Sequence, residues 1–266
     1  MSSGYRHFAG LKGSKQLWVG ADETAYVYTD VESAVDAAQS GDVVHIEPGT
    51  WSLTQELDIS KSITIIGHGR CVINGGTAGI ADRLVMLNKP ASGTAATYMK
   101  FENIEFVNAY AADVIEIDND GGSTGALYVD FVDCGFDAEA TGLSLDVDQT
   151  TNTIDLFVRA SSRLGLRKAM EGCNFALTKA ASEVVIEGYD FGASVIALGA
   201  ADVASIYSLI NCQYESAAMT TGGAASIIFN AQGCAKVAGG AISAVLVGDF
   251  DATAASENLQ AGALAV

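Results

Sequence analysis

A short phrase that recurs from about residue 99 onward constrains the fold more than any other feature. The phrase is a small apolar strand, a polar or Gly step, then Cys, Ile or Tyr, a spacer and an aromatic residue. Repetition of one strand-and-turn unit is typical of solenoids, in which each unit packs against its neighbours. Its copies are MKFENIEFVNA (99–109), LYVDFVDCGFDA (127–138), RKAMEGCNFAL (167–177), VVIEGYDFGA (184–193), SLINCQYESA (208–217) and LVGDFDATA (246–254).

The spacing of these copies indicates coils joined by turns of variable length. The gaps run from about 16 to 39 residues, which excludes a strict array such as a propeller or a hexapeptide helix. We expect coils of about 20 residues, so that a gap of 39 residues spans two coils and TNTIDLFVRAS (152–161) supplies the intervening strand. With coils stacked about 4.8 Å apart, Cys134, Cys173 and Cys212 are predicted to form one internal ladder and the aromatic residues another.

Residues 29–66 predict one short helix followed by short strands. Thr29 and Glu32 form a capping-box pattern, and apolar residues recur at helical spacing over 31–38. A Ser-Gly-Asp turn ends the helix, and VVHI (43–46), ELDI and SITII follow as strands separated by polar or Gly turns.

The capping helix, GDVVHIEPGTW, ISKSITIIGHG and the later FENIEFVNA resemble the cap and core strands of a known superfamily. It is the right-handed β-helix superfamily of pectate lyases, pectin lyases and polygalacturonases. The resemblance implies an all-β fold, a right-handed parallel β-helix solenoid with a short N-terminal capping helix. It implies no single activity, because this fold serves lyases, hydrolases, adhesins and viral spikes. We expect an N-terminal arm (1–20), the parallel β-helix (21–255) and a flexible C-terminal tail (256–266).

Charge limits the partners that we expect. The net charge is −18, and between Phe101 and Val158 there are thirteen acidic residues and no Lys or Arg. Such a surface repels nucleic-acid phosphates and anionic membranes, so we expect neither partner. No secretory signal and no apolar run of about 18 residues is visible, which predicts a protein made and kept in a cytoplasm.

His68 lies in a Gly-His-Gly tripeptide, which resembles a polygalacturonase active-site element. In that family the tripeptide accompanies an Asp-Asp pair, and this sequence contains no Asp-Asp. We therefore interpret residues 67–69 as a turn, in which Gly supplies positive φ. The three His residues (7, 45 and 68) are widely separated, so no zinc site is expected. The five Cys residues are interpreted as buried free thiols.

Acidic residues at alternate positions are candidate calcium ligands. Glu116, Asp118 and Asp120 lie on one face of a predicted strand, as do Asp146 and Asp148. Pectate lyases hold calcium with such acids and, as that family implies, need an Arg base, which the interval 101–158 does not supply. A solvated acidic face is the alternative interpretation, with no metal or other cofactor.

The segment RASSRLGLRK concentrates positive charge at Arg159, Arg163, Arg167 and Lys168. It is the best place for an anionic-saccharide site, because pectin-cleaving lyases use paired Arg residues. The alternatives are a protein interface or salt bridges to the acidic coils. A second group of interface candidates is formed by exposed anchors on the N-terminal arm: Tyr5, His7, Phe8, Leu11, Leu17 and Trp18.

Two functions remain. The preferred hypothesis is a non-enzymatic virion structural protein, a homotrimeric phage capsid decoration or cement protein assembled in the host cytoplasm. Its partners would be its own copies and a major capsid or other virion protein, docked through the N-terminal arm. The alternative is a tail spike or a polysaccharide lyase or depolymerase acting on acidic polysaccharide, which needs an Arg and two or more carboxylates converging on one flank.

Overall fold

A computed structural model of the protein describes most of the chain from residue 14 to residue 236. Within the described ranges the chain forms one helix and 24 strands, and all paired strands run parallel. The described ranges are 14–75, 83–88, 90, 94–108, 113–118, 124–138, 143–149, 152–160, 168–170, 172–177, 182–191, 196–198, 205–214, 219–221, 227–232 and 235–236.

Sheet A is the longest sheet and has nine strands. Its inward-facing residues alternate with outward-facing ones, as in a half-buried strand. In order the strands are β1 (Gln16–Val19), β2 (Val43–Ile46), β5 (Ile63–Gly67), β8 (Thr97–Glu102), β11 (Leu127–Val132), β14 (Ile154–Arg159), β17 (Glu183–Glu187), β20 (Ser205–Ile210) and β23 (Ile227–Gln232).

Three further sheets complete the coil. Sheet C has seven strands: β4 (Leu57–Ile59), β7 (Arg83–Asn88), β10 (Asp113–Asp118), β13 (Leu145–Gln149), β16 (Cys173–Leu177), β19 (Ile196–Leu198) and β22 (Met219–Thr221). Sheet B contains β3 (Gly49–Ser52), β6 (Cys71–Asn74), β9 (Glu105–Asn108) and β12 (Gly135–Ala138). A bridge between Phe136 and Met170 links it to sheet D, with β15 (Lys168–Ala169), β18 (Tyr189–Asp190), β21 (Gln213–Tyr214) and β24 (Ala235–Lys236).

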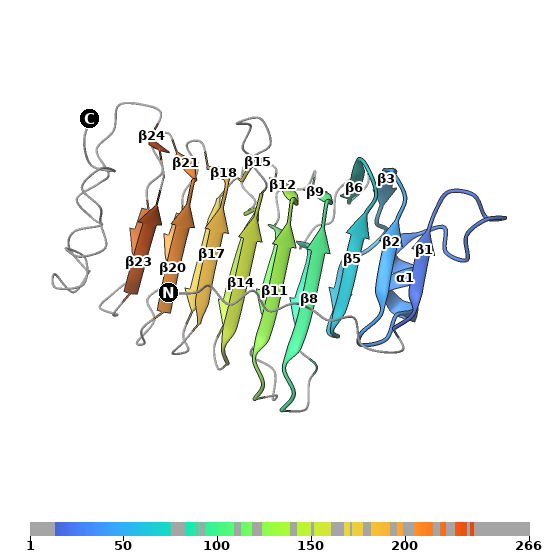
Figure 1. The fold of residues 1–266 in the computed structure, drawn as a ribbon, viewed down its shortest axis with the longest axis horizontal. Helices are drawn as coiled ribbons and strands as arrows, with labels where there is room; N and C mark the ends of the chain where they lie inside the picture. Colours follow the sequence, from blue (N-terminus) through green and yellow to red (C-terminus); the bar gives the residue numbers. More distant parts are fainter. Residues whose placement is uncertain are drawn as a thin grey trace.

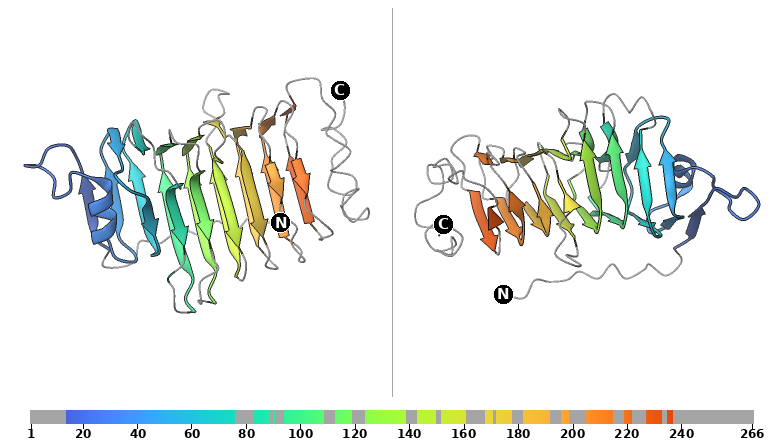
Figure 2. Two further views of the ribbon diagram at one scale, coloured as in Figure 1. Left: turned by 180° about the vertical axis from the view of Figure 1, so that it is seen from behind. Right: turned by 90° about the horizontal axis from the view of Figure 1, so that it is seen from above.

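The chain winds as a right-handed parallel β-helix. In Figure 1 the strands of sheet A face the reader and point upward, and each coil crosses at the top to return behind them. Successive coils are added away from the end that carries the helix, so the chain turns clockwise as it advances. Figure 2 shows the same stack from behind and from above. The predicted fold class is confirmed.

Helix α1 (Val31–Ala37) closes the N-terminal end of the solenoid and packs on β1 and β2 (Figure 1). Its N-cap is Asp30, whose carboxylate accepts a hydrogen bond from the Ser33 amide at 2.6 Å. The predicted capping box of Thr29 and Glu32 is therefore wrong, since Glu32 accepts hydrogen bonds from two backbone amides after β3. In the described part of the chain, no helix is long and apolar enough to cross a membrane.

The solenoid begins before residue 21, because β1 already belongs to sheet A. Leu17, predicted to be an exposed anchor, is only 7% exposed and pairs with Val44, whereas Trp18 points outward as expected. Exposed and buried residues alternate in the Gln-Leu-Trp-Val sequence of β1, a pattern that is typical of a strand. The prediction of a separate N-terminal arm did not take this pattern into account. The other anchors and the C-terminal boundary lie outside the described residues: Tyr5, His7, Phe8, Leu11, the predicted end at 255 and the tail 256–266.

Aromatic side chains inside the coil stack because paired strands are in register. Phe101 and Phe131 are register partners in sheet A, and their ring centroids lie 4.9 Å apart with planes at 18°. Phe106 and Phe136 form a second stack, at 6.1 Å and 10°. The two stacks meet edge to face at Phe106 and Phe131, and such contacts stabilise by about 0.5–1.5 kcal/mol beyond area burial. The predicted ladder, formed by the last aromatic residue of each phrase, is confirmed for Phe106 and Phe136 and is wrong for Phe175, which lies in β16 of sheet C.

The predicted Cys ladder is wrong for one member. Cys134 and Cys212 each follow a sheet A strand at the same corner, whereas Cys173 begins β16 in sheet C. The equal gaps of 39 residues between the cysteines led to this error, because the coils are longer than the expected 20 or so residues. The register partners of β11 and β14, for example, lie 27 positions apart. The strand expected over 152–161 is present as β14. All four cysteines of the described ranges are buried free thiols, and burial raises the pKa of Cys71 to about 12.

The corner after sheet A places one residue per coil in left-handed backbone conformation in several coils. Asn103, Asp133 and Asn211 have φ of 56°, 54° and 52°, and Gly188 has φ of 81°. Asn, Asp and Gly tolerate this region better than other residues. These residues are the polar or Gly step of the recurring phrase. The Asn103 amide also donates from Nδ2 to two carbonyl oxygens of the preceding corner, at 2.9 and 2.8 Å.

Phe131→Ala is expected to lower the free energy of unfolding by about 3–5 kcal/mol, because it empties the centre of the aromatic stack. Phe157→Ala is the matched control, since that ring lies half-buried on the outer face of β14. Its loss should be less than half as large, as measured by urea unfolding. Equal losses would contradict the assignment of inner and outer faces.

Candidate functional site

Arg159, the described Arg of the predicted basic cluster, ends β14 on the outer face of sheet A. Its Nη2 lies 2.7 Å from Oδ1 and 2.6 Å from Oδ2 of Asp130 on the neighbouring strand β11. The Asp130 side chain is only 10% exposed, so the ion pair is shielded from water. This contact is the salt bridge to the acidic coils that the sequence offered as one alternative. Arg163 and Arg167 lie outside the described residues, so a shared site remains a prediction.

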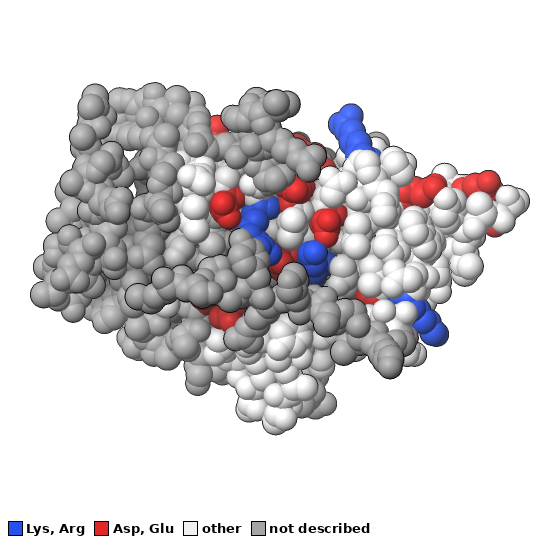
Figure 3. Space-filling view, in the orientation of Figure 1, with Lys and Arg blue, Asp and Glu red and all other residues white. Residues whose placement is uncertain are grey.

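A second ion pair lies on the same face. Lys100 on β8 is the register neighbour of Asp130, and its Nζ lies 2.8 Å from a carboxylate oxygen of Glu102. Figure 3 shows basic side chains over the middle of this face with acidic ones around them. The described part of sheet A therefore presents mixed charge rather than a basic patch.

The acidic residues predicted to share a strand face do so on sheet C. Glu116 and Asp118 both lie on the outer face of β10, and their register partners on β13 are Asp146 and Asp148. Among the described residues, no group of three or more His, Cys, Asp or Glu side chains could hold a metal ion. Asp120 lies outside the described residues, so the calcium site predicted with Asp120 remains a prediction.

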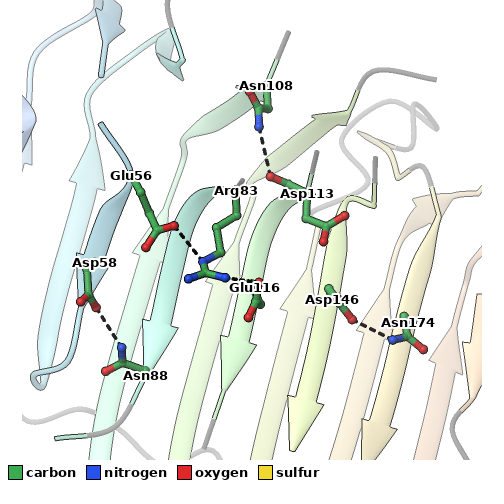
Figure 4. A network of polar contacts seen from close by, with 9 residues as sticks. All are labelled: Glu56, Asp58, Arg83, Asn88, Asn108, Asp113, Glu116, Asp146 and Asn174. Atoms are coloured by element: carbon green, nitrogen blue, oxygen red, sulfur yellow. Dashed lines mark hydrogen bonds and ion pairs between the residues drawn. The ribbon is translucent and has the colours of Figure 1, made fainter. Parts of the chain in front are cut away.

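Arg83 is the functional candidate that the sequence analysis missed. It begins β7, and its guanidinium lies between two carboxylates from adjacent coils (Figure 4). Nε is 2.8 Å from Glu56 Oε2, and Nη1 is 2.7 Å from Glu116 Oε2. The sequence did contain a signal for this contact, because Arg83 lies in the coil just before the acidic interval. Stacking places that coil directly against the first acidic coil.

Further polar contacts between coils lie on the sheet C surface. Asn88 donates to Asp58 at 3.0 Å, and Asn174 donates to Asp146 at 2.8 Å (Figure 4). These contacts and the Arg83 bridge link successive strands of one sheet. The arrangement places an Arg with two carboxylates on one flank, but each carboxylate contacts the guanidinium directly. Its immediate role is to hold three coils together.

A separate cluster lies at the N-terminal end of sheet A. Trp18 on β1 stacks on His45 of β2, with ring centroids 4.4 Å apart and planes at 19°. The His68 ring, after β5, lies 5.1 Å from both. Nδ1 of His45 is 2.9 Å from Nε2 of His68, and Nε2 of His45 is 2.5 Å from Oε1 of Gln16.

The hydrogen bonds of this cluster define the tautomers. Because Oε1 of Gln16 is an acceptor, Nε2 of His45 carries the proton and donates it. Nδ1 of neutral His45 is then an acceptor, and Nε2 of His68 donates to it. Burial, followed by the charge of His68, lowers the pKa of His45. The His45 ring is therefore neutral at pH 7.

The Gly-His-Gly tripeptide forms a corner, as predicted. Gly69 has φ of 69°, and a Cβ on Gly67 would lie 2.4 Å from the carbonyl oxygen of Asn103. The sequence analysis was wrong to treat His45 and His68 as distant. Their separation of 23 positions is close to one coil here, since β2 and β5 pair at an offset of 21. His45 also faces outward rather than contributing to the core.

Comparisons with known proteins found likenesses of structure alone. No family model and no curated protein matches the sequence. The chain is similar to a pectin methylesterase solved in complex with a hexasaccharide, with 10% identity, a TM-score of 0.40 and coverage of 95% of this chain and 98% of that one. A mutant pectin methylesterase with another hexasaccharide gives 11% identity, a TM-score of 0.34 and the same coverage. Neither likeness assigns an activity to this chain.

Arg159→Met is expected to lower the free energy of unfolding of the isolated chain by about 1–3 kcal/mol, because the shielded Asp130 carboxylate loses its partner. Glu102→Gln, which breaks the more exposed pair, is the control and should cost less than about 1 kcal/mol. Urea unfolding measures both. Unchanged stability of Arg159→Met would instead favour Arg159 as a contact to another molecule.

Proposed function

We propose that the protein is a non-enzymatic structural protein of a virion, and that it serves as a homotrimeric capsid decoration or cement protein. The observation that carries this proposal is how the chain uses its cations. Arg83, Lys100 and Arg159 each pair with carboxylates of the same chain, and Lys61 donates to three backbone carbonyls at the end of α1. The Arg83 and Arg159 pairs join neighbouring coils and so stiffen the stack, which is the requirement of a scaffold.

The proposed docking end is the N-terminal end. Within the described residues the large hydrophobic side chains that stand exposed are Trp18, at 42%, and Val27, at 86%. Trp18 lies on β1, which packs on the capping helix at the end where the solenoid begins (Figure 1), and Val27 precedes Tyr28, which bridges to Val19 at the end of β1. Exposed aromatic and apolar residues that gather at one place favour a protein partner. The major capsid protein or another virion protein is the partner that we propose for this end.

The acidic surface fits the same role. The net charge is −18 on 266 residues, so a shell that carries many copies of the protein would repel other shells of the same kind. This repulsion would keep the particles dispersed in solution. It also favours a basic partner surface over a nucleic acid or an anionic membrane.

The mass of the protein in solution tests this function. We expect three times the chain mass of 27.4 kDa in light scattering, and co-sedimentation with shells assembled from a candidate capsid protein. Replacing Trp18 by Ala and Val27 by Ser should weaken co-sedimentation at least tenfold without changing the trimer. Phe157→Ala, on the outer face of sheet A away from this end, is the control. A strict monomer that does not associate with any virion protein contradicts the proposal.

One observation favours a second function, a tail spike or depolymerase acting on acidic polysaccharide. Arg83 lies with Glu56 and Glu116 on one flank, as an acid-saccharide enzyme requires.

An assay for unsaturated uronic products from acidic polysaccharides, with and without calcium, separates the two functions. We expect no product from the wild-type protein. Product formation that Arg83→Met abolishes and Arg159→Met preserves would establish the enzyme and overturn the structural role.

A further inference from the structure

Two imidazole rings from successive coils meet on the outer face of the solenoid. His45 lies in β2 and His68 follows β5, and each ring is partly exposed to solvent. Nδ1 of His45 and Nε2 of His68 are 2.9 Å apart. Both nitrogens are therefore close enough to bind one ion that reaches the pair from water.

The separation of the two nitrogens selects a coordination geometry. Imidazole nitrogens bind first-row divalent ions at about 2.0–2.1 Å, so two ligands at a right angle lie about 2.9 Å apart and two tetrahedral ligands about 3.3 Å apart. Right-angled nitrogen ligands are typical of tetragonal Cu²⁺ and Ni²⁺ sites. We propose that His45 and His68 bind a divalent transition metal ion of this class, Cu²⁺ or Ni²⁺, with water in the remaining positions.

Gln16 provides the outer contact that such a ligand needs. A metal-binding His usually donates its second ring N–H to an oxygen, which fixes its tautomer and its orientation. Nε2 of His45 donates to Oε1 of Gln16, so the lone pair of Nδ1 faces His68 before any ion arrives.

The only chemical change that binding requires is in His68. In the hydrogen-bonded pair its proton is on Nε2, and for metal binding that proton moves to Nδ1 of the same ring. In this tautomer exchange the neutral form of the ring keeps its single proton. The metal then replaces the hydrogen bond between the two rings.

Trp18 packs against both rings and makes the site observable. Its ring centroid lies 4.4 Å from His45 and 5.1 Å from His68. A Cu²⁺ or Ni²⁺ ion at the two nitrogens would quench its fluorescence. The chain contains one other Trp, Trp51, which lies on β3, so Trp51→Phe leaves Trp18 as the sole reporter.

The experiment titrates CuCl₂ and NiCl₂ into the full-length Trp51→Phe protein and follows Trp18 fluorescence. Saturable quenching with one ion per chain is expected, together with two-nitrogen coupling in the electron paramagnetic resonance spectrum of the Cu²⁺ form. His45→Phe and His68→Phe keep an aromatic ring in the stack but remove the ligands, and each should weaken binding at least tenfold. Gln16→Leu should weaken it by about tenfold, because the outer contact is lost.

His7→Ala is the matched control, since it removes the remaining His of the chain and should leave the affinity unchanged. Circular dichroism and thermal unfolding of each variant separate loss of ligand from loss of fold. Unchanged affinity in both His45→Phe and His68→Phe overturns the proposal, as does binding that His7→Ala abolishes. The result does not depend on the oligomer or the virion partner, so failure here leaves the proposed function standing.

Discussion

Backbone hydrogen bonding between parallel strands in register is the constraint from which the other features of this molecule follow. Register pairing sets each side chain directly above its counterpart in the next coil, about one strand spacing away. Inside the coil this produces the Phe101–Phe131 stack, and outside it produces the Tyr98–Tyr128 stack, with centroids 4.7 Å apart and planes at 6°. Apolar and aromatic residues gain from such repetition because identical shapes pack well against each other.

The same constraint is unfavourable for acidic residues, and the ion pairs compensate for it. Glu116 and Asp146 are register partners, so two carboxylates stand beside one another on sheet C. Arg83 approaches the first, and an amide of Asn174 approaches the second. Arg159 plays the same part for Asp130 on sheet A. The acidic interval carries no Lys or Arg of its own; Arg83 lies in the coil before it, and Arg159 directly follows its last residue.

Local sequence signals predicted the class of fold and its first elements well. The helix at 31–37 and the strands at 43–46 and 63–67 lie within a residue or two of their predicted positions. The prediction failed for Cys173, Arg83 and the meeting of His45 with His68. These contacts depend on coil length, and coil length varies along the chain. The strands β5 and β8 pair at an offset of 36 positions, whereas β20 and β23 pair at an offset of 22. A periodicity read along the chain averages over such differences, so it identifies a solenoid without identifying which residues are neighbours.

The corner after sheet A has the same length and backbone conformation in three of the coils. β8, β11 and β20 are each followed by the next strand after two residues, one of which has positive φ. The connections into sheet C differ, with four residues between β9 and β10 and eight between β6 and β7. In these coils the corner after sheet A keeps one length, whereas the connections into sheet C differ. Because the coils already differ in length between sheets B and C, that connection is the natural place to graft a foreign peptide for display on this solenoid.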